Sequence, residues 1–365
     1  LYKYRDMPVI YNQKMKEFDY KSNMDEELPV HTLKDNIADD VDAELDKGVL
    51  STFDFINDAF ARGKYYMKQI VGVCAPPGTG KSMFLQQEAI TFARQGKKVH
   101  LMTLGDQTLE MVMVRLVALA GNFPMREVTK NFKFYRDQID PDILDNLYFT
   151  VKDSYEVMIA TYIDFCINGV IKDVDILMID YDANFVQENE GMYQQGLLVY
   201  NSLTKLKNLG KLVFIATQPK QSFFNAPDMD MTAPGESSGK IHVLDMLITI
   251  GIDRDRKMRM GFMKIAKMRN GEGESVGKPI PWVGTKSGRL AQITPTMYEA
   301  YVRRDCYLAL DYNDVVNERA MELAMQTIDD IEPEQNEDAV PGISQKMEDA
   351  PKKDIQDNGD PLIEL

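Results

Sequence analysis

The sequence predicts an α/β fold in which a mostly parallel, twisted β-sheet is flanked by helices. From residue 50 to about residue 310, short apolar segments of strand length alternate with longer segments whose apolar residues recur at helical spacing. This alternation is typical of a parallel sheet with crossover helices. Apolar residues make up 44% of the 365 residues, which is enough for a sizeable hydrophobic core.

The elements are predicted in order along the chain. Residues 1–48 are predicted to form a polar arm. A short amphipathic helix is predicted between residues 35 and 50, at the end of this arm. The core spans residues 49–310, where apolar runs predict strands and 3.6-residue periodicity predicts helices. The predicted strands cover 70–74, 97–104, 147–151, 175–180, 211–218, 246–252 and 261–267. One predicted helix begins after residue 82. The others cover 111–123, 155–171, 196–209 and, beyond the core, 311–328.

The acidic charge is concentrated at the C-terminus. Residues 329–365 hold twelve Asp and Glu against three Lys, so they carry −9 of the formal net charge of −15. This composition predicts a disordered tail, which would serve as a solubilising extension or as a partner-binding segment. The weaker charge of the remaining chain is compatible with a local basic groove.

The cysteine pattern indicates a reducing compartment. Cys74, Cys166 and Cys306 are widely spaced and form no C-x-x-C pair, so neither a disulfide framework nor a zinc site is predicted. No signal-peptide pattern and no apolar run of membrane-spanning length is visible. We therefore expect a cytoplasmic protein without a membrane partner. A first residue of Leu instead of Met is compatible with a fragment.

Residues 75–82 read APPGTGKS and lie between a predicted strand and a predicted helix. They fit the phosphate-loop pattern G-x-x-x-x-G-K-[ST] except at the first position, where Ala75 replaces Gly. The two glycines let backbone N–H groups turn toward a phosphate at a helix N-terminus. Lys81 is predicted to reach the β- and γ-phosphates of ATP, and Ser82 to bind Mg²⁺. The predicted nucleotide-binding residues are Ala75, Pro76, Pro77, Gly78, Thr79, Gly80, Lys81, Ser82 and Met83.

Two polar residues end later strands. Asp180 ends the strand 175–180, where its carboxylate is expected to hold Mg²⁺ through water. Gln218 ends the strand 211–218, where its amide is expected to sense the γ-phosphate and signal to the following loop. Either residue alone is an ordinary loop residue at a strand end. Because the carboxyl ends of parallel strands share one edge, both are predicted to face the phosphate loop.

With these motifs in place, residues 48–277 resemble the ATPase core of the DnaB-type replicative helicases, a RecA-like family of ring-shaped motors found in bacteria and phages. The order and spacing of six segments are more specific than any one of them. The segments are APPGTGKS at 75–82, VHLMTLGDQ at 99–107, ILMIDYDANF at 176–185, LVFIATQ at 212–218, ESSGKIHVLDMLITI at 236–250 and KIAKMRNGEGESVG at 264–277.

The resemblance implies a catalytic site between subunits. In the family, the K-x-R-N-G element crosses the subunit interface, so Arg269 would be an arginine finger and Lys267 its companion. A rigid guanidinium supplied by a neighbour stabilises the charge on the γ-phosphoryl oxygens. The alternative is that Lys267 and Arg269 form the solvated face of a strand.

Two departures from the family pattern affect the site. The family places a Glu directly after the second strand, whereas this chain has Gly105 there and an acid only at Asp106. Asp106 is therefore the candidate general base. The family's Gly-rich turn before the first core strand is replaced by residues 61–68, which read ARGKYYMK.

The resemblance places DNA contacts in loops that line the channel of a ring. The candidate loops are 184–195, which carries acidic residues, and 219–239. The second mixes cations and aromatic rings suited to phosphate contact and base stacking. The predicted DNA-binding residues are Lys220, Phe223, Phe224 and Lys240. The alternative is that these loops are flexible surface segments.

The leading hypothesis is an ATP-dependent helicase that moves on single-stranded DNA as a hexameric homo-oligomer, with ATP and Mg²⁺ bound between subunits. A primase, a loader or a polymerase would contact the N-terminal region or the acidic tail. One alternative is a RecA-type recombinase that forms an open filament, because heterologous contacts give rings or filaments according to whether they close. The other is a nucleotide-switch loader or scaffold with slow hydrolysis.

Overall fold

The computed structural model describes residues 38–329 apart from 106, 186–191, 236–237, 270, 272 and 305–309. The predicted arm up to residue 37 and most of the predicted acidic tail lie outside the described residues. The chain divides into two compact units, Leu1–Ala320 and Met321–Leu365. The described part of the second unit is the end of helix α13 (Tyr312–Asp329). The fold described below is that of the first unit.

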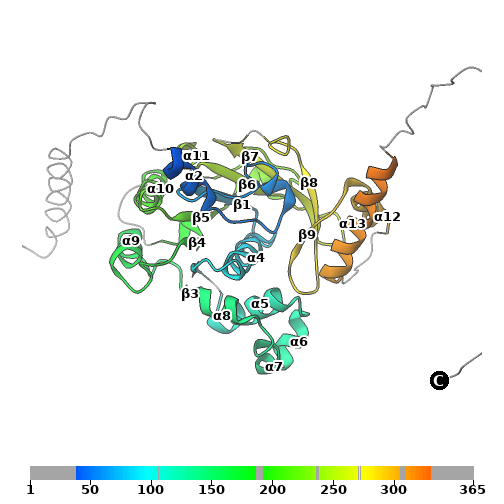
Figure 1. The fold of residues 1–365 in the computed structure, drawn as a ribbon, viewed down its shortest axis with the longest axis horizontal. Helices are drawn as coiled ribbons and strands as arrows, with labels where there is room; N and C mark the ends of the chain where they lie inside the picture. The colour runs from blue at the N-terminus through cyan, green and yellow to red at the C-terminus, as the bar shows by residue number, and fades with distance from the viewer. Residues whose placement is uncertain are drawn as a thin grey trace, which may run out of the picture. The chain divides into compact units, whose positions relative to one another are not determined.

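A nine-stranded sheet forms the centre of the first unit (Figure 1). The strand order is β3-β2-β4-β5-β1-β6-β7-β8-β9. The pairs from β3 to β6 are parallel, and the pairs from β6 to β9 are antiparallel. The strands are β1 (Ile70–Cys74), β2 (Val99–Leu104), β3 (Leu147–Lys152), β4 (Ile176–Asp180), β5 (Leu212–Thr217), β6 (Met246–Ile250), β7 (Met260–Met268), β8 (Ile280–Gly284) and β9 (Leu290–Gln292). The predicted α/β class with a mostly parallel sheet is confirmed.

The helices are α2 (Ala38–Asp46), α3 (Asp54–Asn57), α4 (Lys81–Arg94), α5 (Leu109–Gly121), α6 (Met125–Lys130), α7 (Phe132–Arg136), α8 (Pro141–Asn146), α9 (Ile159–Asn168), α10 (Met192–Asn208), α11 (Ser238–Val243), α12 (Pro295–Arg304) and α13. The seven predicted strands are all present. The sequence did not predict β8, β9 or α12, because residues 280–304 are interrupted by prolines and glycines and pair only through the antiparallel extension of the sheet. Within the described part of the chain, no helix is long and apolar enough to cross a membrane.

The alternation of side chains along the central strands separates two hydrophobic layers. Val71 and Val73 of β1 belong to the layer that contains the buried residues of α4 and α5. Ile70 and Cys74 of the same strand belong to the layer that contains those of α9 and α10. The sheet is thus covered on both faces, which is why its parallel strands read as continuous apolar runs.

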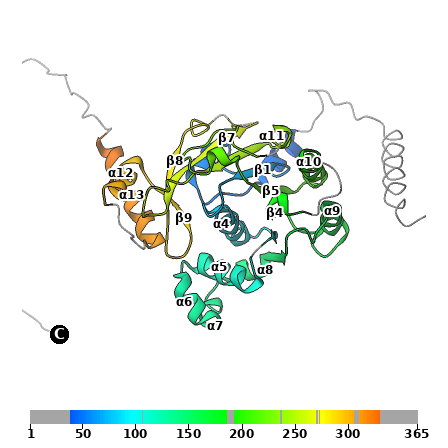
Figure 2. The same ribbon diagram turned by 180° about the vertical axis from the view of Figure 1, so that it is seen from behind.

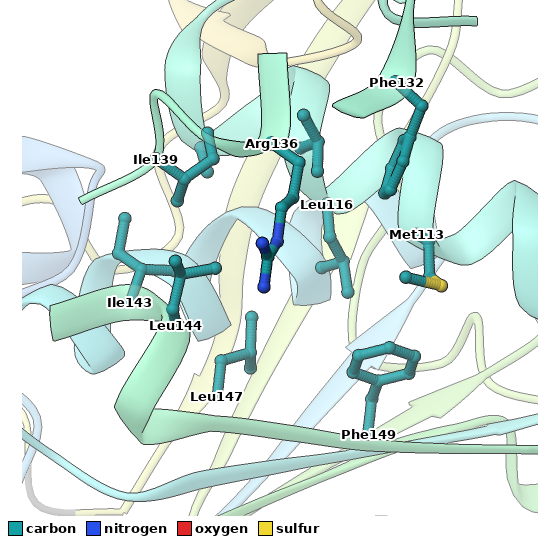
Figure 3. A pocket seen from close by; sticks show the side chains of 11 residues that line it. Met113, Leu116, Phe132, Arg136, Ile139, Ile143, Leu144, Leu147 and Phe149 are labelled. Atoms are coloured by element: carbon teal, nitrogen blue, oxygen red, sulfur yellow. The ribbon is translucent and has the colours of Figure 1, made fainter. Parts of the chain in front are cut away.

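Four helices, α5 to α8, form a block between β2 and β3 in the sequence, and both views show them together beside α4 (Figures 1 and 2). The block and β3 line a partly open cavity of about 210 Å³. Its lining is Met113, Leu116, Val117, Ala120, Phe132, Arg136, Ile139, Ile143, Leu144, Leu147 and Phe149. Figure 3 shows the Arg136 side chain running into the middle of this apolar ring toward Leu147. The cavity includes no phosphate-loop residue.

Glu88 connects α4 to the segment before β1. The backbone N–H of Thr52 donates to Glu88 Oε1 over 2.9 Å, and the Glu88 side chain is completely buried. Burial raises the pKa of Glu88 to about 7, although the Thr52 hydrogen bond opposes this shift. The carboxyl group therefore binds its proton more tightly in the folded chain than in the unfolded chain.

We expect Glu88→Gln to remove a pH dependence of stability. The folded-state pKa of Glu88 is raised, so its contribution is fully present below the unfolded value of about 4.5 and is lost as the pH rises through about 7. Glutamine keeps the acceptor without the charge, so the variant should gain melting temperature relative to the parent between about pH 5 and about pH 8. The control is Glu299→Gln, at an exposed ion pair with Arg303. An unchanged difference across this window would contradict the assignment.

Candidate functional site

The phosphate loop lies between β1 and α4, as predicted. Gly78 and Gly80 have φ angles of 75° and 128°, values that side chains other than glycine rarely adopt. A Cβ at Gly80 would lie 3.1 Å from Arg259 Nη2, a tight contact that the arginine side chain would have to relieve. The loop therefore ends directly at Lys81, the first residue of α4.

Lys81 and Asp180 meet at this edge of the sheet. Lys81 Nζ lies 3.3 Å from Asp180 Oδ1, and the two side chains are 9% and 5% exposed. The same ammonium lies 3.8 Å from the centroid of the Tyr181 ring. Asp180 reaches the loop because it is the last residue of β4, and β4 is parallel to its neighbours β2 and β5. The structure thus brings together two residues that lie far apart in the sequence.

The remaining donors fit a phosphate group with a divalent cation. Thr79 Oγ1 is buried and has no hydrogen-bond partner among the described residues. Ser82 Oγ accepts a hydrogen bond from Gln107 Nε2 over 3.3 Å, and Gln107 Oε1 accepts from Arg115 Nη1 over 2.7 Å. The hydroxyl of Ser82 and the carboxylate of Asp180 are hard oxygen ligands of the kind that Mg²⁺ prefers. These residues fit ATP and Mg²⁺.

Two arginines missed by the sequence analysis also contact the loop. Arg254 Nη2 donates to Pro77 O over 3.0 Å, and Arg259 Nη2 donates to Gly78 O over 3.2 Å. Burial first, and then Arg115, lowers the pKa of Arg259. The sequence signal for them is the charged segment DRDRKMR at 253–259, between the predicted strands 246–252 and 261–267, which indicates a turn and nothing more.

Lys267 and Arg269 engage the end of α11 and the turn after it. Lys267 Nζ donates to Leu244 O over 2.7 Å and also to Ile241 O. Burial first, and then Arg269, lowers the pKa of Lys267. Arg269 Nη1 pairs with Asp245 Oδ1 over 3.1 Å, and its side chain remains 47% exposed. Of the two, Arg269 presents the more accessible charge.

Gln218 begins a loop that closes on itself. Its carbonyl oxygen accepts from Gly235 N over 2.9 Å, and Pro219 bridges to Pro234. Within this loop Lys220 is exposed, and its Nζ donates to Thr232 O over 2.9 Å. Two aromatic rings of the same loop, Phe223 and Phe224, are half-buried. Three of the four predicted DNA-binding residues therefore share one short surface loop.

The structure places Lys240 differently from the prediction. Lys240 is 2% exposed, and its Nζ lies 2.9 Å from Asp182 Oδ2. Tyr200 donates to the same carboxylate oxygen over 3.1 Å, and burial first, then Asp182, raises the pKa of Tyr200. The sequence analysis expected Lys240 to be a loop cation, whereas the structure buries it in an ion pair with Asp182.

Gly105 occupies the position at which the family has its glutamate. Gly105 has a φ of 130°, and a Cβ there would lie 2.7 Å from Asn184 Nδ2. That amide donates to Leu104 O over 2.6 Å, which holds it against the end of β2. A glutamate therefore does not fit position 105 on this backbone. Asp106, the predicted general base, lies outside the described residues.

Gly105→Ala is expected to destabilise the chain more than Gly96→Ala does. Both glycines have positive φ, so substitution costs about 1–2 kcal/mol in backbone energy at Gly96 (φ 77°) and about 1–3 kcal/mol at Gly105 (φ 130°). Only at Gly105 would the new Cβ also strike a neighbour, because nothing lies within 4 Å at Gly96. We expect a further loss of about 1–3 kcal/mol at Gly105 in denaturant unfolding. Equal losses would show that Asn184 moves without cost.

Comparisons with known proteins were made by sequence and by structure. No protein-family model matches the chain, and no curated protein matches it in sequence. A solved structure described as an "ATPase Domain" superposes with a TM-score of 0.50 and 18% identity, over 62% of this chain and 85% of that chain. One described as "The Structure Of A DnaB-Like Replicative Helicase And Its Interactions With Primase" superposes with a TM-score of 0.56 and 16% identity, over 78% of this chain and 75% of that chain.

At these identities the likeness shows the fold. It agrees with the mostly parallel sheet, in which the phosphate loop follows a central strand. The RecA-like architecture that the sequence motifs implied is therefore confirmed. The chain has the fold of the ATPase domain of DnaB-type replicative helicases.

Proposed function

We propose that this protein is an ATP-dependent DNA helicase that moves along single-stranded DNA in the cytoplasm. The meeting of Lys81 and Asp180 beside the phosphate loop supports this proposal most directly, on a fold shared with a DnaB-like replicative helicase. The proposal includes a hexameric ring with ATP hydrolysed between subunits. It also includes a primase, loader or polymerase that contacts the N-terminal region or the acidic tail.

Each residue near the loop has a proposed task. Lys81 turns from Asp180 toward the β- and γ-phosphates, while the Thr79 hydroxyl and the loop N–H groups donate to the same anion. Asp180 and Ser82 would hold the Mg²⁺ ion, Asp180 through water and Ser82 through its hydroxyl, and the ion would neutralise charge on the phosphates. ATP supplies the phosphoryl group that passes to water. Asp106 accepts the proton of that water, and Gln218 holds the γ-phosphate end of the site.

Arg269 acts on a neighbouring subunit. Its guanidinium is anchored on one side by Asp245 yet is nearly half exposed, which suits a group held rigidly at a surface. Lys267 supports it from behind by fixing the end of α11 through two carbonyl groups. We therefore assign the finger role to Arg269 and a positioning role to Lys267.

The loop 219–235 contacts DNA. Lys220 supplies an exposed charge for backbone phosphates, and Phe223 with Phe224 supplies rings on which bases stack. Contacts of this kind are insensitive to sequence, as a translocating motor requires. Lys240 has no part in this interface because its charge is compensated by Asp182.

One observation favours a second candidate, a nucleotide switch. Gly105 stands where the family has its glutamate, and the contact with Asn184 excludes a larger residue. A site with a displaced base would hydrolyse ATP slowly and act through its nucleotide-bound state. A switch and a motor differ in one measurable property, because only a motor needs hydrolysis to be accelerated by DNA. A RecA-type filament differs from both in assembly, which imaging of the ATP-bound state distinguishes.

Strand separation on forked DNA tests the proposed function. The expected result is ATP-dependent separation by the unmodified protein and none by Lys81→Ala, because the phosphates lose their main charged donor. Lys133→Ala, at an exposed lysine of α7, serves as the control and should retain separation. Separation that proceeds equally without ATP would contradict a motor.

Mixing two inactive variants tests the placement of the site between subunits. Lys81→Ala lacks the phosphate-binding lysine, and Arg269→Ala lacks the arginine finger. Each variant alone should therefore lose at least about a hundredfold in ATP hydrolysis. In a mixed ring, some subunit interfaces join an intact phosphate loop on one subunit to an intact Arg269 on its neighbour. We expect recovery to as much as about a quarter of the parental rate when the interfaces act independently.

Two results would count against this arrangement. As a control, each variant alone at the same total concentration should show no recovery of ATP hydrolysis. If Arg269→Ala hydrolyses ATP at the parental rate, or if mixing restores nothing while both variants remain folded and assembled, the finger does not act across a subunit interface.

A further inference from the structure

One side chain joins the phosphate loop to the loop 219–235. Arg254 Nη2 donates to Pro77 O over 3.0 Å, and Arg254 Nε donates to Phe224 O over 3.2 Å. The two acceptors are backbone carbonyl groups from segments that are far apart in the sequence. Among the described residues Arg254 forms no ion pair, so these two carbonyl contacts are what the structure shows for its guanidinium.

The second half of the loop 219–235 is fixed to the hairpin that carries Arg254. Phe262 N donates to Pro227 O over 3.2 Å, and Thr249 Oγ1 donates to Met229 O over 2.8 Å. Lys264 Nζ lies 2.6 Å from Asp228 Oδ2. These contacts come from both strands of the hairpin, β6 and β7. These contacts tie residues 227–229 of the loop to the hairpin.

The turn of the same hairpin rests on the phosphate loop. Arg259 Nη2 donates to Gly78 O over 3.2 Å, directly beside the Pro77 carbonyl that Arg254 holds. A Cβ on Gly80 would lie 3.1 Å from that same nitrogen, so the contact is close. In a phosphate loop the N–H groups turn inward to the anion, which leaves carbonyl groups available on the outer side. Any reorientation of these peptide units on nucleotide binding therefore acts first on the two arginines.

We propose that Arg254 is a positioning residue that couples the nucleotide state of the phosphate loop to the conformation of the loop 219–235. The planar guanidinium holds two carbonyl groups at a fixed relative geometry, which a lysine ammonium cannot reproduce. Coupling of this kind is reciprocal, so a ligand on the loop 219–235 also alters nucleotide affinity. The role of that loop in DNA binding rests on the proposed function, whereas the coupling itself does not.

Hydrogen exchange measures the coupling without DNA. The samples are the full chain with and without a non-hydrolysable ATP analogue and Mg²⁺, each confirmed to bind the nucleotide. We expect the nucleotide to change amide exchange within residues 219–226 by at least about fivefold in the parent, and this response to disappear in both Arg254→Ala and Arg254→Lys. Arg256→Ala, in the same turn, should keep it, because Arg256 pairs with Asp253 of its own turn. An equal response in Arg254→Ala, or no response in the nucleotide-bound parent, would overturn the proposal.

DNA-stimulated hydrolysis is a second readout, because a loop uncoupled from the phosphate loop no longer transmits DNA binding to the nucleotide site. The ratio of ATPase rates with and without single-stranded DNA should fall at least about fivefold in Arg254→Ala. A uniform fall of both rates with an unchanged ratio indicates a merely structural contact and overturns the proposal. If the parent hydrolyses ATP without any response to DNA, the proposed helicase function fails, while the exchange experiment still decides the coupling.

Discussion

The ion pair between Lys81 and Asp180 is the constraint on which the rest of the site depends. Two opposite charges lie 3.3 Å apart with little exposure to solvent, and burial of this kind is costly unless each charge is compensated. The pair forms because β1 and β4 are parallel strands of one sheet and end at the same edge. Lys81 is placed to turn toward a phosphate group, and Asp180 is placed to face a cation. One arrangement therefore serves both folding and binding.

Local signals made the centre of the fold predictable from the sequence. The apolar runs of β1 and β4 are buried on both faces, and the phosphate loop needs glycine at Gly78 and Gly80, so each is recognisable within a few residues. The resemblance to a known family added the order of the motifs. By contrast, β8 and β9 exist only through antiparallel pairing that begins at β7, and a short strand of this kind carries little signal of its own.

Long-range contacts explain what the sequence analysis missed at the site. Lys240 looked like a surface cation, yet its partner Asp182 comes from the segment after β4. Arg254 and Arg259 looked like a solvated turn, although they reach carbonyl groups of the phosphate loop. No periodicity reports such pairings. The arginine contacts depend on β6 lying beside β1 in the sheet, and the Lys240 pair depends on α11 lying near the segment after β4. The sequence shows the charge of each residue, but it does not show the group with which that charge pairs.

The cavity in the helical block has a practical consequence for protein engineering. Ala120 lines it and is 8% exposed, so a larger apolar side chain there has free volume to occupy. Filling such volume is a recognised route to thermostable variants, provided that the new side chain adopts an unstrained rotamer. No phosphate-loop residue lines this cavity, so heat resistance can be altered there by a substitution that does not contact the loop directly.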